Sequence, residues 1–277
     1  MSPGGIRILA DAGAGDIGVA IISATDYFCS VQLITHSQIG THHTDHNEDA
    51  LVAEELTPEH YLLAVMDGCS SGQESHFAAG LITKILRKIA RQTNLRTFAE
   101  RRTPGVQELL KDTVRQLFTT LRDQKALLDI GRYELLTTLV LAVVDVKQRT
   151  GEIIVVGDGL VAVNGEITEV DQDNQPDYLG YHLDEPFEEW WPRQQQYFSA
   201  EDITDFSLAT DGLHTFRLTS PESFPPIGEE EIIRYLLEDR EEEVDAFMLR
   251  RKLLMLEETH GLKPTDDLTI VRLLLGD

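Results

Sequence analysis

Three apolar runs in this sequence end in the same way, with an aspartate that is followed by a glycine. The runs are "LLAVMDG", "EIIVVGDG" and "FSLATDG", and they place Asp67, Asp158 and Asp211 directly after expected strands. A fourth acidic position, Asp266 with Asp267, stands instead just before the apolar run "LTIVRLLL". Because strands of one sheet share common ends, these four points can converge in space. The pattern therefore predicts a cluster of carboxylates at one end of a sheet.

Such a cluster favours a bound divalent cation. Carboxylates a few ångströms apart raise one another's pKa, and a hard metal ion removes that conflict. Oxygen ligands from carboxylates and glycine carbonyls suit Mg²⁺ or Mn²⁺ better than Zn²⁺. A single Asp-Gly pair is usually only a turn, so the argument depends on its repetition after apolar strands. Upstream, "HTDHNEDA" adds Glu48 and Asp49 at another strand start, whereas its histidines lack the spacing of a helical zinc motif.

The remaining pattern indicates helices and antiparallel strands in separate parts of the chain. Apolar residues recur with helical spacing over residues 73–92 and 106–121. The β-branched runs that follow, with a tight turn at Asn164-Gly165, predict an antiparallel meander. A further strand, an acidic helical region at 229–259 and a closing strand complete the chain. This order predicts an α+β fold in which two sheets pack together with helices outside.

The chain is long enough for one large domain with a buried core, since 42% of its 277 residues are hydrophobic. We expect residues 31–277 to form this domain and residues 1–30 to form a tail or an extra edge strand. Residues 171–199 combine Pro, Asp and Gln with two tryptophans and show no period, which indicates an ordered insertion rather than a linker.

The net charge of −24 argues against nucleic acid or an anionic membrane surface as a partner, because phosphate binding needs clustered Lys and Arg. Cys29 and Cys69 lie far apart, so the sequence indicates neither a disulfide framework nor a structural zinc site. The start of the chain does not resemble a signal peptide, and the apolar runs are shorter than the roughly 20 residues of a spanning helix. A cytoplasmic location is therefore expected.

Six short motifs in this order resemble those of the PPM-type, or type 2C, metal-dependent protein serine/threonine phosphatases, in their bacterial-like branch. The motifs are "NEDA", "AVMDG", "TTLVLAVV", "VVGDG", "ATDGL" and "TDDLTIV", and the resemblance extends over residues 38–275. Each motif alone is weak, whereas six in order are specific. The resemblance implies a central β-sandwich of two antiparallel sheets flanked by helices, with a two-metal site at one end. It also implies a flap, for which residues 171–199 are the candidate.

The resemblance also implies roles for individual residues around two Mn²⁺ or Mg²⁺ ions and possible third-ion binding. No protein nucleophile is implied; a metal-activated water attacks phosphorus, with Asp67, Asp211 and Asp266 as the essential carboxylates. The implied metal ligands are Asp67 bridging both ions, the Gly68 carbonyl on the first, Asp211 and Asp266 on the second, Glu48 and Asp49 through water, and Asp158 with Asp211 on the third.

Two positions depart from the family pattern. Family members usually carry an arginine that binds the substrate phosphate four residues before the glutamate of the "ED" pair, and this chain has Thr44 there. Many also carry a histidine directly after "DG" as a general acid, and this chain has Cys69. Candidates for a substitute phosphate contact are Thr44 itself and the neighbouring histidines, of which we single out His43.

Three functions are consistent with these residues. The first is a signalling enzyme that hydrolyses phosphoserine and phosphothreonine in proteins, with a phosphorylated protein as substrate and a cognate Ser/Thr kinase as counterpart. The second is a pseudophosphatase, a phosphoprotein-binding or regulatory module without turnover, and Thr44 and Cys69 motivate it. The third is a two-metal hydrolase of small phosphate esters or nucleotides, although no phosphate-binding loop supports nucleotide recognition. The complete set of acidic ligands favours the first.

Overall fold

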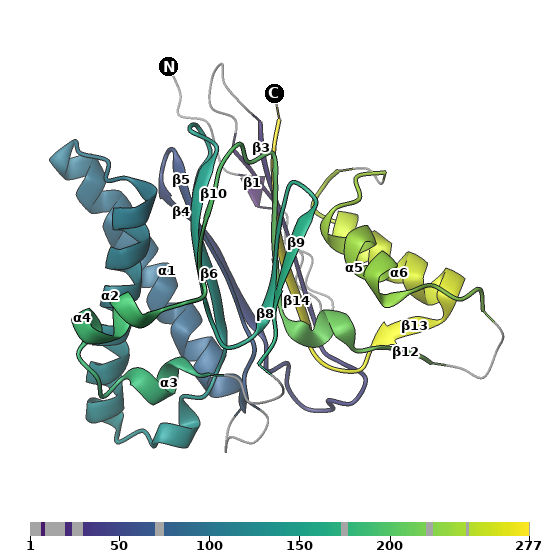
Figure 1. Ribbon diagram of the computed structural model, residues 1–277, viewed down its shortest axis with the longest axis horizontal. Helices are drawn as coiled ribbons and strands as arrows, with labels where there is room; N and C mark the ends of the chain where they lie inside the picture. Colours follow the sequence, from purple (N-terminus) through teal and green to yellow (C-terminus); the bar gives the residue numbers. More distant parts are fainter. Residues whose placement is uncertain are drawn as a thin grey trace.

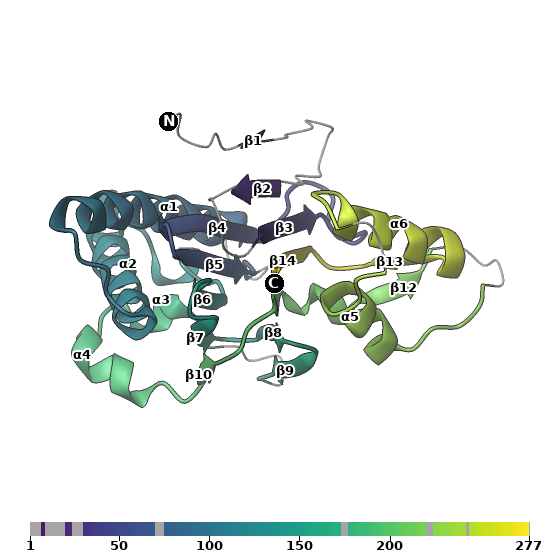
Figure 2. The same ribbon diagram turned by 90° about the horizontal axis from the view of Figure 1, so that it is seen from above.

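The computed structural model describes residues 7–8, 20–23, 30–69, 75–172, 177–219, 224–241 and 244–276. In this part of the chain, two antiparallel β-sheets pack face to face, and helices cover both outer faces (Figure 1). Figure 2, seen from above, shows α1 and α2 beside one sheet and α5 and α6 beside the other. The fold class predicted from the sequence, an α-β-β-α sandwich, is confirmed.

The larger sheet has the strand order β1-β2-β3-β14-β11-β8-β9 in the described residues, and the smaller has the order β10-β7-β6-β5-β4. The strands of the larger sheet are β1 (Arg7–Ile8), β2 (Ala20–Ser23), β3 (Val31–Gln38), β8 (Gly159–Val163), β9 (Glu166–Val170), β11 (Asp205–Ala209) and β14 (Leu268–Leu275). Those of the smaller sheet are β4 (Ala50–Thr57), β5 (His60–Met66), β6 (Leu139–Asp145), β7 (Thr150–Val156) and β10 (Tyr197–Ala200). A separate ribbon pairs β12 (Phe216–Leu218) with β13 (Leu262–Pro264).

The helices continue beyond the ranges that the apolar pattern predicts. The α-helices are α1 (Ser75–Glu100), α2 (Val106–Leu128), α3 (Leu179–His182), α4 (Phe187–Trp190), α5 (Glu229–Leu237) and α6 (Met248–His260), and the 3-10 helices are η1 (Arg132–Glu134), η2 (Trp191–Arg193) and η3 (Asp211–His214). The acidic helical region predicted at 229–259 is therefore two helices. Of the helices in the described part of the chain, none combines the length and the hydrophobicity that a membrane span requires.

Strand β5 explains why its sequence is apolar without alternation. Leu62, Ala64 and Met66 face the helices α1 and α2, whereas the alternate residues Leu63 and Val65 face the second sheet. Since both faces of the strand are buried, every position favours an apolar side chain. A third apolar cluster lies between the larger sheet and helices α5 and α6. These three layers fix the two sheets rigidly enough for their ends to carry a site.

The predicted meander is wrong in one respect, because its strands belong to different sheets. Strand β7 pairs with β6 in the smaller sheet, and β8 pairs with β9 in the larger. The chain crosses between the sheets at Asp158, between Gly157 and Gly159, whose φ angles are +94° and +143°. Hydrophobic alternation does not specify which sheet a strand joins, so the sequence pattern missed the crossing. The tight turn at Asn164-Gly165 is confirmed, with φ angles of +51° and +86°.

The expected insertion at 171–199 is described at 171–172 and 177–199, where it packs on helix α2. Trp190 is 1% exposed, and its ring centroid lies 4.4 Å from that of Phe118. Arg122 of α2 donates a 2.7 Å hydrogen bond to the Leu183 carbonyl. These contacts make the segment part of the core. Of the predicted 1–30 segment, only the backbone of β1 and β2 and residue 30 are described, and β2 pairs with β3.

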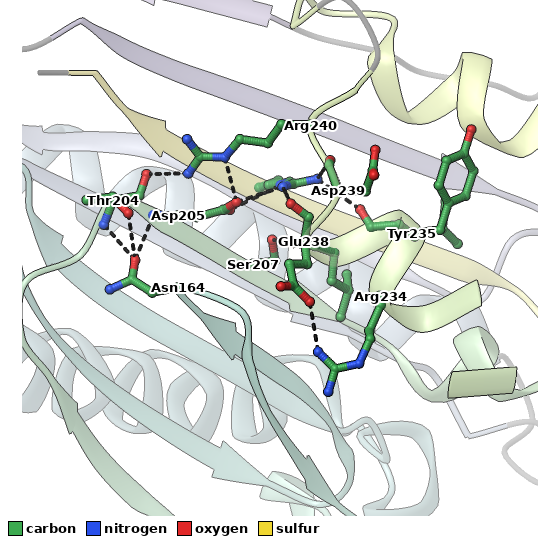
Figure 3. A network of polar contacts seen from close by, with 12 residues as sticks. Asn164, Thr204, Asp205, Ser207, Arg234, Tyr235, Glu238, Asp239 and Arg240 are labelled. Carbon is green, nitrogen blue, oxygen red and sulfur yellow. Dashed lines mark hydrogen bonds and ion pairs between the residues drawn. The ribbon is translucent and has the colours of Figure 1, made fainter. Parts of the chain in front are cut away.

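A buried polar network anchors helix α5 to the larger sheet (Figure 3). Arg272 of β14 is fully buried and donates to both carboxylate oxygens of Asp205, at 3.1 and 2.7 Å. The same guanidinium donates to the Asp239 carbonyl at 2.9 Å, just beyond the end of α5. Lys252 of α6, also fully buried, donates to that carbonyl at 2.6 Å. Two cations thus satisfy the carbonyl end of the helix, where positive charge is favourable.

Candidate metal and phosphate site

The strand registers bring the predicted acidic residues to one end of the sandwich. Ala50 pairs with Met66, so Asp49 and Asp67 emerge side by side from β4 and β5. In the other sheet, Ala209 pairs with Leu160 on one side and with Ile270 on the other. The remaining predicted carboxylates lie just outside these strands: Asp158 directly precedes β8, Asp211 follows the end of β11 by two residues, and Asp266 precedes the start of β14 by two residues.

Asp67 is fixed through its backbone by Thr137 and Thr138, which directly precede β6. Its N–H donates to the Thr138 hydroxyl at 3.0 Å, and its carbonyl accepts from the Thr138 N–H at 2.9 Å. The Thr137 hydroxyl donates to the same carbonyl at 2.7 Å. Gly68 forms an isolated antiparallel β-bridge with Thr137. The hydrogen bonds of this bridge join the residues on either side: the Thr138 N–H donates to the Asp67 carbonyl, and the Cys69 N–H donates to the Leu136 carbonyl. In this geometry the Gly68 carbonyl takes no part in the hydrogen bonds of the bridge, and it lies next to Asp67 in the chain.

Asp49 is held by the strand-end residue Thr210. The Thr210 hydroxyl donates to Oδ2 of Asp49 at 2.7 Å and accepts from the Thr269 N–H at 3.0 Å. Asp49 is 8% exposed, and its Oδ1 atom is buried without a hydrogen-bond partner in the described residues. An unpartnered carboxylate oxygen in this position costs free energy unless a donor or cation binds it.

The two aspartates before β14 have different surroundings. The Asp267 side chain is 1% exposed and accepts hydrogen bonds from the N–H groups of Gly40 at 2.7 Å and Glu48 at 2.5 Å. Asp266 has a side chain that is 47% exposed. His43 lies between them, 3.0 Å from Asp267 and 3.6 Å from Asp266. Asp267 therefore organises the chain from Gly40 to Glu48, and Asp266 is accessible from the site.

Close backbone packing explains the glycine after Asp211. A Cβ atom at Gly212 would lie 1.9 Å from the carbonyl oxygen of Asp267. No real side chain tolerates such a distance, so only glycine allows η3 to lie against the turn that carries Asp266. The glycine of "TDG" thus sets the spacing between two predicted metal ligands.

The carboxylates perturb one another strongly. Burial raises the pKa of Asp67 well above its ordinary value, and the charges of Asp49, Asp211 and Asp266 raise it further. Burial, together with the charge of Asp267, raises the pKa of Asp49 to about 8, against the hydrogen bond from Thr210.

The second sheet shows the same effect. Burial raises the pKa of Asp211 to about 6, with Asp158 and Asp266 adding to the shift. Burial also raises the pKa of Asp158, with a contribution from Asp171. Such a concentration of perturbed acids in one place is typical of a functional site.

The residues present fit a hard divalent cation. The donors are carboxylate oxygens, and the pKa values of Asp49 and Asp67 are raised by burial and by the charges of neighbouring carboxylates. A bound cation would offset both effects. Oxygen ligands of this kind suit Mg²⁺ or Mn²⁺. Within the described ranges, no three His, Cys, Asp or Glu side chains already converge as a ready-made ligand set. The carboxylates are thus close enough to interact without meeting at one point.

The remaining predicted residues lie on the chain between β3 and β4. Thr44 is exposed, as are His42 and His46, and Glu48 is half-buried. The His43 side chain contacts the acidic pair, and the charges and hydrogen bond of Asp267 raise its pKa against the opposing effect of burial. The assignment of phosphate binding to Thr44 or His43 stays a prediction.

The sequence pattern did not predict three residues that shape this site, and it included Asp267 only as the neighbour of Asp266. Thr138 and Thr210 fix Asp67 and Asp49, Asp267 fixes the approach to β4, and Tyr178 lies near Asp67 from the 171–199 segment. The motifs "TTLVLAVV" and "ATDGL" contain both threonines, but only Thr210 is next to a strand-end aspartate, so that signal was available for Thr210 and not for Thr138. Nothing in the sequence places Tyr178.

The sequence model of the family described as "Protein phosphatase 2C" matches residues 39–249, which is more than half of the chain. The chain belongs to the protein phosphatase 2C family. This assignment confirms the resemblance found in the six motifs. No curated protein sequence matched this phosphatase family member.

Solved structures of bacterial serine/threonine phosphatases share the fold of this family member. Stp1 from Staphylococcus aureus is 18% identical, with a TM-score of 0.57 and coverage of 88% of this chain and 95% of Stp1. The Mycobacterium tuberculosis phosphatase PstP/Ppp is also 18% identical, with a TM-score of 0.54 and coverage of 89% and 99%. RsbX in complex with magnesium is 14% identical, with a TM-score of 0.51 and coverage of 93% and 100%. At these identities the similarity establishes the fold.

Proposed function

We propose that this protein is a metal-dependent phosphatase that hydrolyses phosphoserine and phosphothreonine in proteins. The observation that carries the proposal is the placement of Asp49, Asp67, Asp158, Asp211 and Asp266 at one end of the sandwich, close enough for their charges to raise one another's carboxyl pKa values. Family membership supports the reaction class. A magnesium complex of a relative with the same fold is consistent with the choice of metal.

In this proposal the strand-end aspartates hold two Mn²⁺ or Mg²⁺ ions. Asp67 and the Gly68 carbonyl would hold one ion, with Asp67 shared, and Asp211 and Asp266 would hold the other. Glu48 and Asp49 would act through water, and Asp158 with Asp211 would hold a third, weaker ion. The chemistry that such ions supply is activation of water and neutralisation of phosphate charge.

The protein itself supplies position and rigidity. Thr138 holds the Asp67 backbone, and Thr210 holds one oxygen of Asp49 while the other faces the cluster. Asp267 keeps Glu48 in place by accepting its N–H. No side-chain nucleophile is required, and Cys69 has no arginine-backed phosphate loop around it in the sequence. Catalysis therefore depends on keeping several carboxylates ionised and close together.

The direct test is release of phosphate from a phosphoserine or phosphothreonine peptide by the purified protein with Mn²⁺ or Mg²⁺. We expect turnover by the wild type and its loss in Asp211→Asn. Asp123→Asn is the matched control, because Asp123 is an exposed residue of α2. Wild-type protein that is inactive with several divalent metals and peptides would refute the proposal, and faster hydrolysis of nucleotides would change the substrate class.

A pseudophosphatase is the second candidate, and the residues at two positions favour it. Thr44 replaces the phosphate-binding arginine of the family, and Cys69 stands where many relatives have a general-acid histidine. Calorimetry separates the two functions: phosphopeptide binding without turnover indicates a binding module, whereas phosphate release establishes the enzyme. In either case the partner is a phosphorylated protein, and a Ser/Thr kinase that produces it is part of the proposal.

A further inference from the structure

Tyr178 reaches the acidic site from the segment between β9 and β10. The chain directly before it packs against Gly157, the residue before Asp158, since a Cβ atom at Gly157 would lie 2.8 Å from the Asp177 carbonyl oxygen. The Tyr178 hydroxyl is paired with Cys69 and is close enough to Asp67 and Asp158 for their charges to act on it. The side chain is half-buried. It is thus a polar group from a distant part of the sequence placed directly beside the strand-end aspartates.

The backbone around Tyr178 is fixed by close packing. A Cβ atom at Gly180 would lie 2.4 Å from the Leu135 carbonyl oxygen, so α3 lies tightly against the chain that leads into β6. On the other side, the Nε2 atom of His182 is 2.7 and 2.8 Å from the two carboxylate oxygens of Asp177. The turn that carries Tyr178 therefore has little freedom to move away from the site.

The ring of Tyr178 is also packed. It meets the ring of Tyr181 edge to face, with centroids 5.5 Å apart. The guanidinium of Arg132 lies over the Tyr181 ring, 4.6 Å from its centroid. This stack restricts the orientation of the Tyr178 hydroxyl, which is the only polar atom of its side chain.

The phenol remains a hydrogen-bond donor under ordinary conditions. Burial raises the pKa of Tyr178, and Cys69, Asp67 and Asp158 raise it further. Its present partner Cys69 is a thiol, which is a weak hydrogen-bond acceptor. A hydrogen bond from the Tyr178 hydroxyl to a charged oxygen is therefore stronger than its present hydrogen bond to the thiol, because hydrogen bonds to charged groups are the stronger ones.

We propose that the Tyr178 hydroxyl binds the phosphate group of the substrate, donating a hydrogen bond to a phosphoryl oxygen beside Asp67. This inference rests on the proposed phosphatase function and names a substrate-binding residue for the same site. It assigns to the 171–199 segment a direct part in substrate recognition. Tyr178 supplies one neutral hydrogen bond to the phosphate group.

The test uses Tyr178→Phe, which keeps the ring and removes the hydroxyl, with Tyr181→Phe as the matched control. We expect kcat/KM on a phosphopeptide to fall roughly tenfold to a hundredfold in Tyr178→Phe. The inhibition constant of inorganic phosphate should weaken by a similar factor, while the melting temperature and the Mn²⁺ activation midpoint stay at wild-type values. Tyr181→Phe should match the wild type in all four measurements.

Cys69→Ala separates substrate binding from a purely structural role of the Tyr178–Cys69 contact. If Tyr178 binds phosphate, removal of the thiol leaves phosphate inhibition unchanged or strengthens it. If the contact only holds the loop, Cys69→Ala and Tyr178→Phe weaken phosphate inhibition equally, and that result overturns the inference. Wild-type values for both kcat/KM and phosphate inhibition in Tyr178→Phe also overturn it.

The inference and the proposed function can fail separately. If the wild type binds phosphate but does not turn over peptides, the phosphatase function fails, and calorimetry with Mn²⁺ and inorganic phosphate still tests Tyr178. Loss of phosphate affinity in Tyr178→Phe then supports the inference, and unchanged affinity refutes it.

Discussion

Replacement of Asp49 by asparagine should stabilise the metal-free protein at neutral pH. The buried Asp49 carboxyl has a pKa raised to about 8, mainly by burial, whereas an unfolded aspartate ionises near pH 4. Between these values the folded state holds a proton that the unfolded state has lost. A raised pKa of this kind contributes stability that is complete at low pH and is lost as pH rises. Asparagine keeps an acceptor for the Thr210 hydroxyl and has no proton to lose.

The size of the stabilisation follows from the pH range between the unfolded and the folded pKa of Asp49. Each pH unit lowers the free energy of unfolding by about 1.4 kcal/mol, so three units from about pH 4.5 to 7.5 correspond to at most about 4 kcal/mol. Asp67 and Asp211 also have raised pKa values and add to the pH dependence in both proteins. Because the Asp49 charge itself raises the pKa of Asp67, the difference between wild type and Asp49→Asn reports the titration of Asp49 together with its effect on Asp67. Water entry and relaxation around the site reduce the measured value.

The assay is urea unfolding in the presence of a chelator, at several pH values across this window. Asp49→Asn should gain on the wild type as pH rises, and the two should converge near pH 4.5. The exposed Asp45→Asn, in the same loop, should follow the wild type. Added Mn²⁺ should stabilise the wild type by about 2.7 kcal/mol at one hundred times its dissociation constant, and Asp49→Asn by less. Parallel pH dependences for wild type and Asp49→Asn would refute the reasoning.

Other substitutions test the buried ion pair of the larger sheet and the close backbone packing next to the site. Asp205→Asn should lower the free energy of unfolding by about 3–5 kcal/mol in urea unfolding, because it leaves the fully buried Arg272 without its charged partner; a change below 1 kcal/mol, roughly the worth of a surface pair, would contradict this. Gly212→Ala should cost about 1–3 kcal/mol and reduce activity, because its Cβ atom must displace the Asp267 carbonyl. Gly80→Ala, inside α1 with nothing within 4 Å of the added Cβ, should instead stabilise by about 0.5–1 kcal/mol, and equal effects of the two substitutions would exclude the steric explanation.

The sequence predicted the parts of this structure that depend on local pattern. Strand-end aspartates were recognisable because the same Asp-Gly pair follows three apolar runs, and the Asn164-Gly165 turn has a strong conformational preference. The crossing between sheets at Asp158 was missed, because pairing partners are chosen by tertiary packing. Helix α1 continues to Glu100 although its last turns are largely polar, so amphipathic spacing alone ended it too early.

The supporting residues of the site were harder to predict for a physical reason. Thr138, Thr210 and Asp267 act through hydrogen bonds between residues at least 59 positions apart in the chain. Tyr178 comes from a segment without periodicity, where neither helix nor strand pattern specifies the direction of a side chain. Contacts of this kind form only when the two sheets are assembled, so a local sequence pattern does not predict them.

The hydrogen bonds of Asp267 have an evolutionary consequence for the loop that they close. One carboxylate holds both Gly40 and Glu48, and the exposed residues Thr44 and His46 lie between these two fixed points. The free-energy cost of lengthening such a loop is small, about 0.6 kcal/mol for a doubling. Insertions and substitutions in the loop can therefore accumulate while Asp49 and Asp67 keep their positions. Selection can alter what this edge of the site recognises without rebuilding the carboxylates behind it.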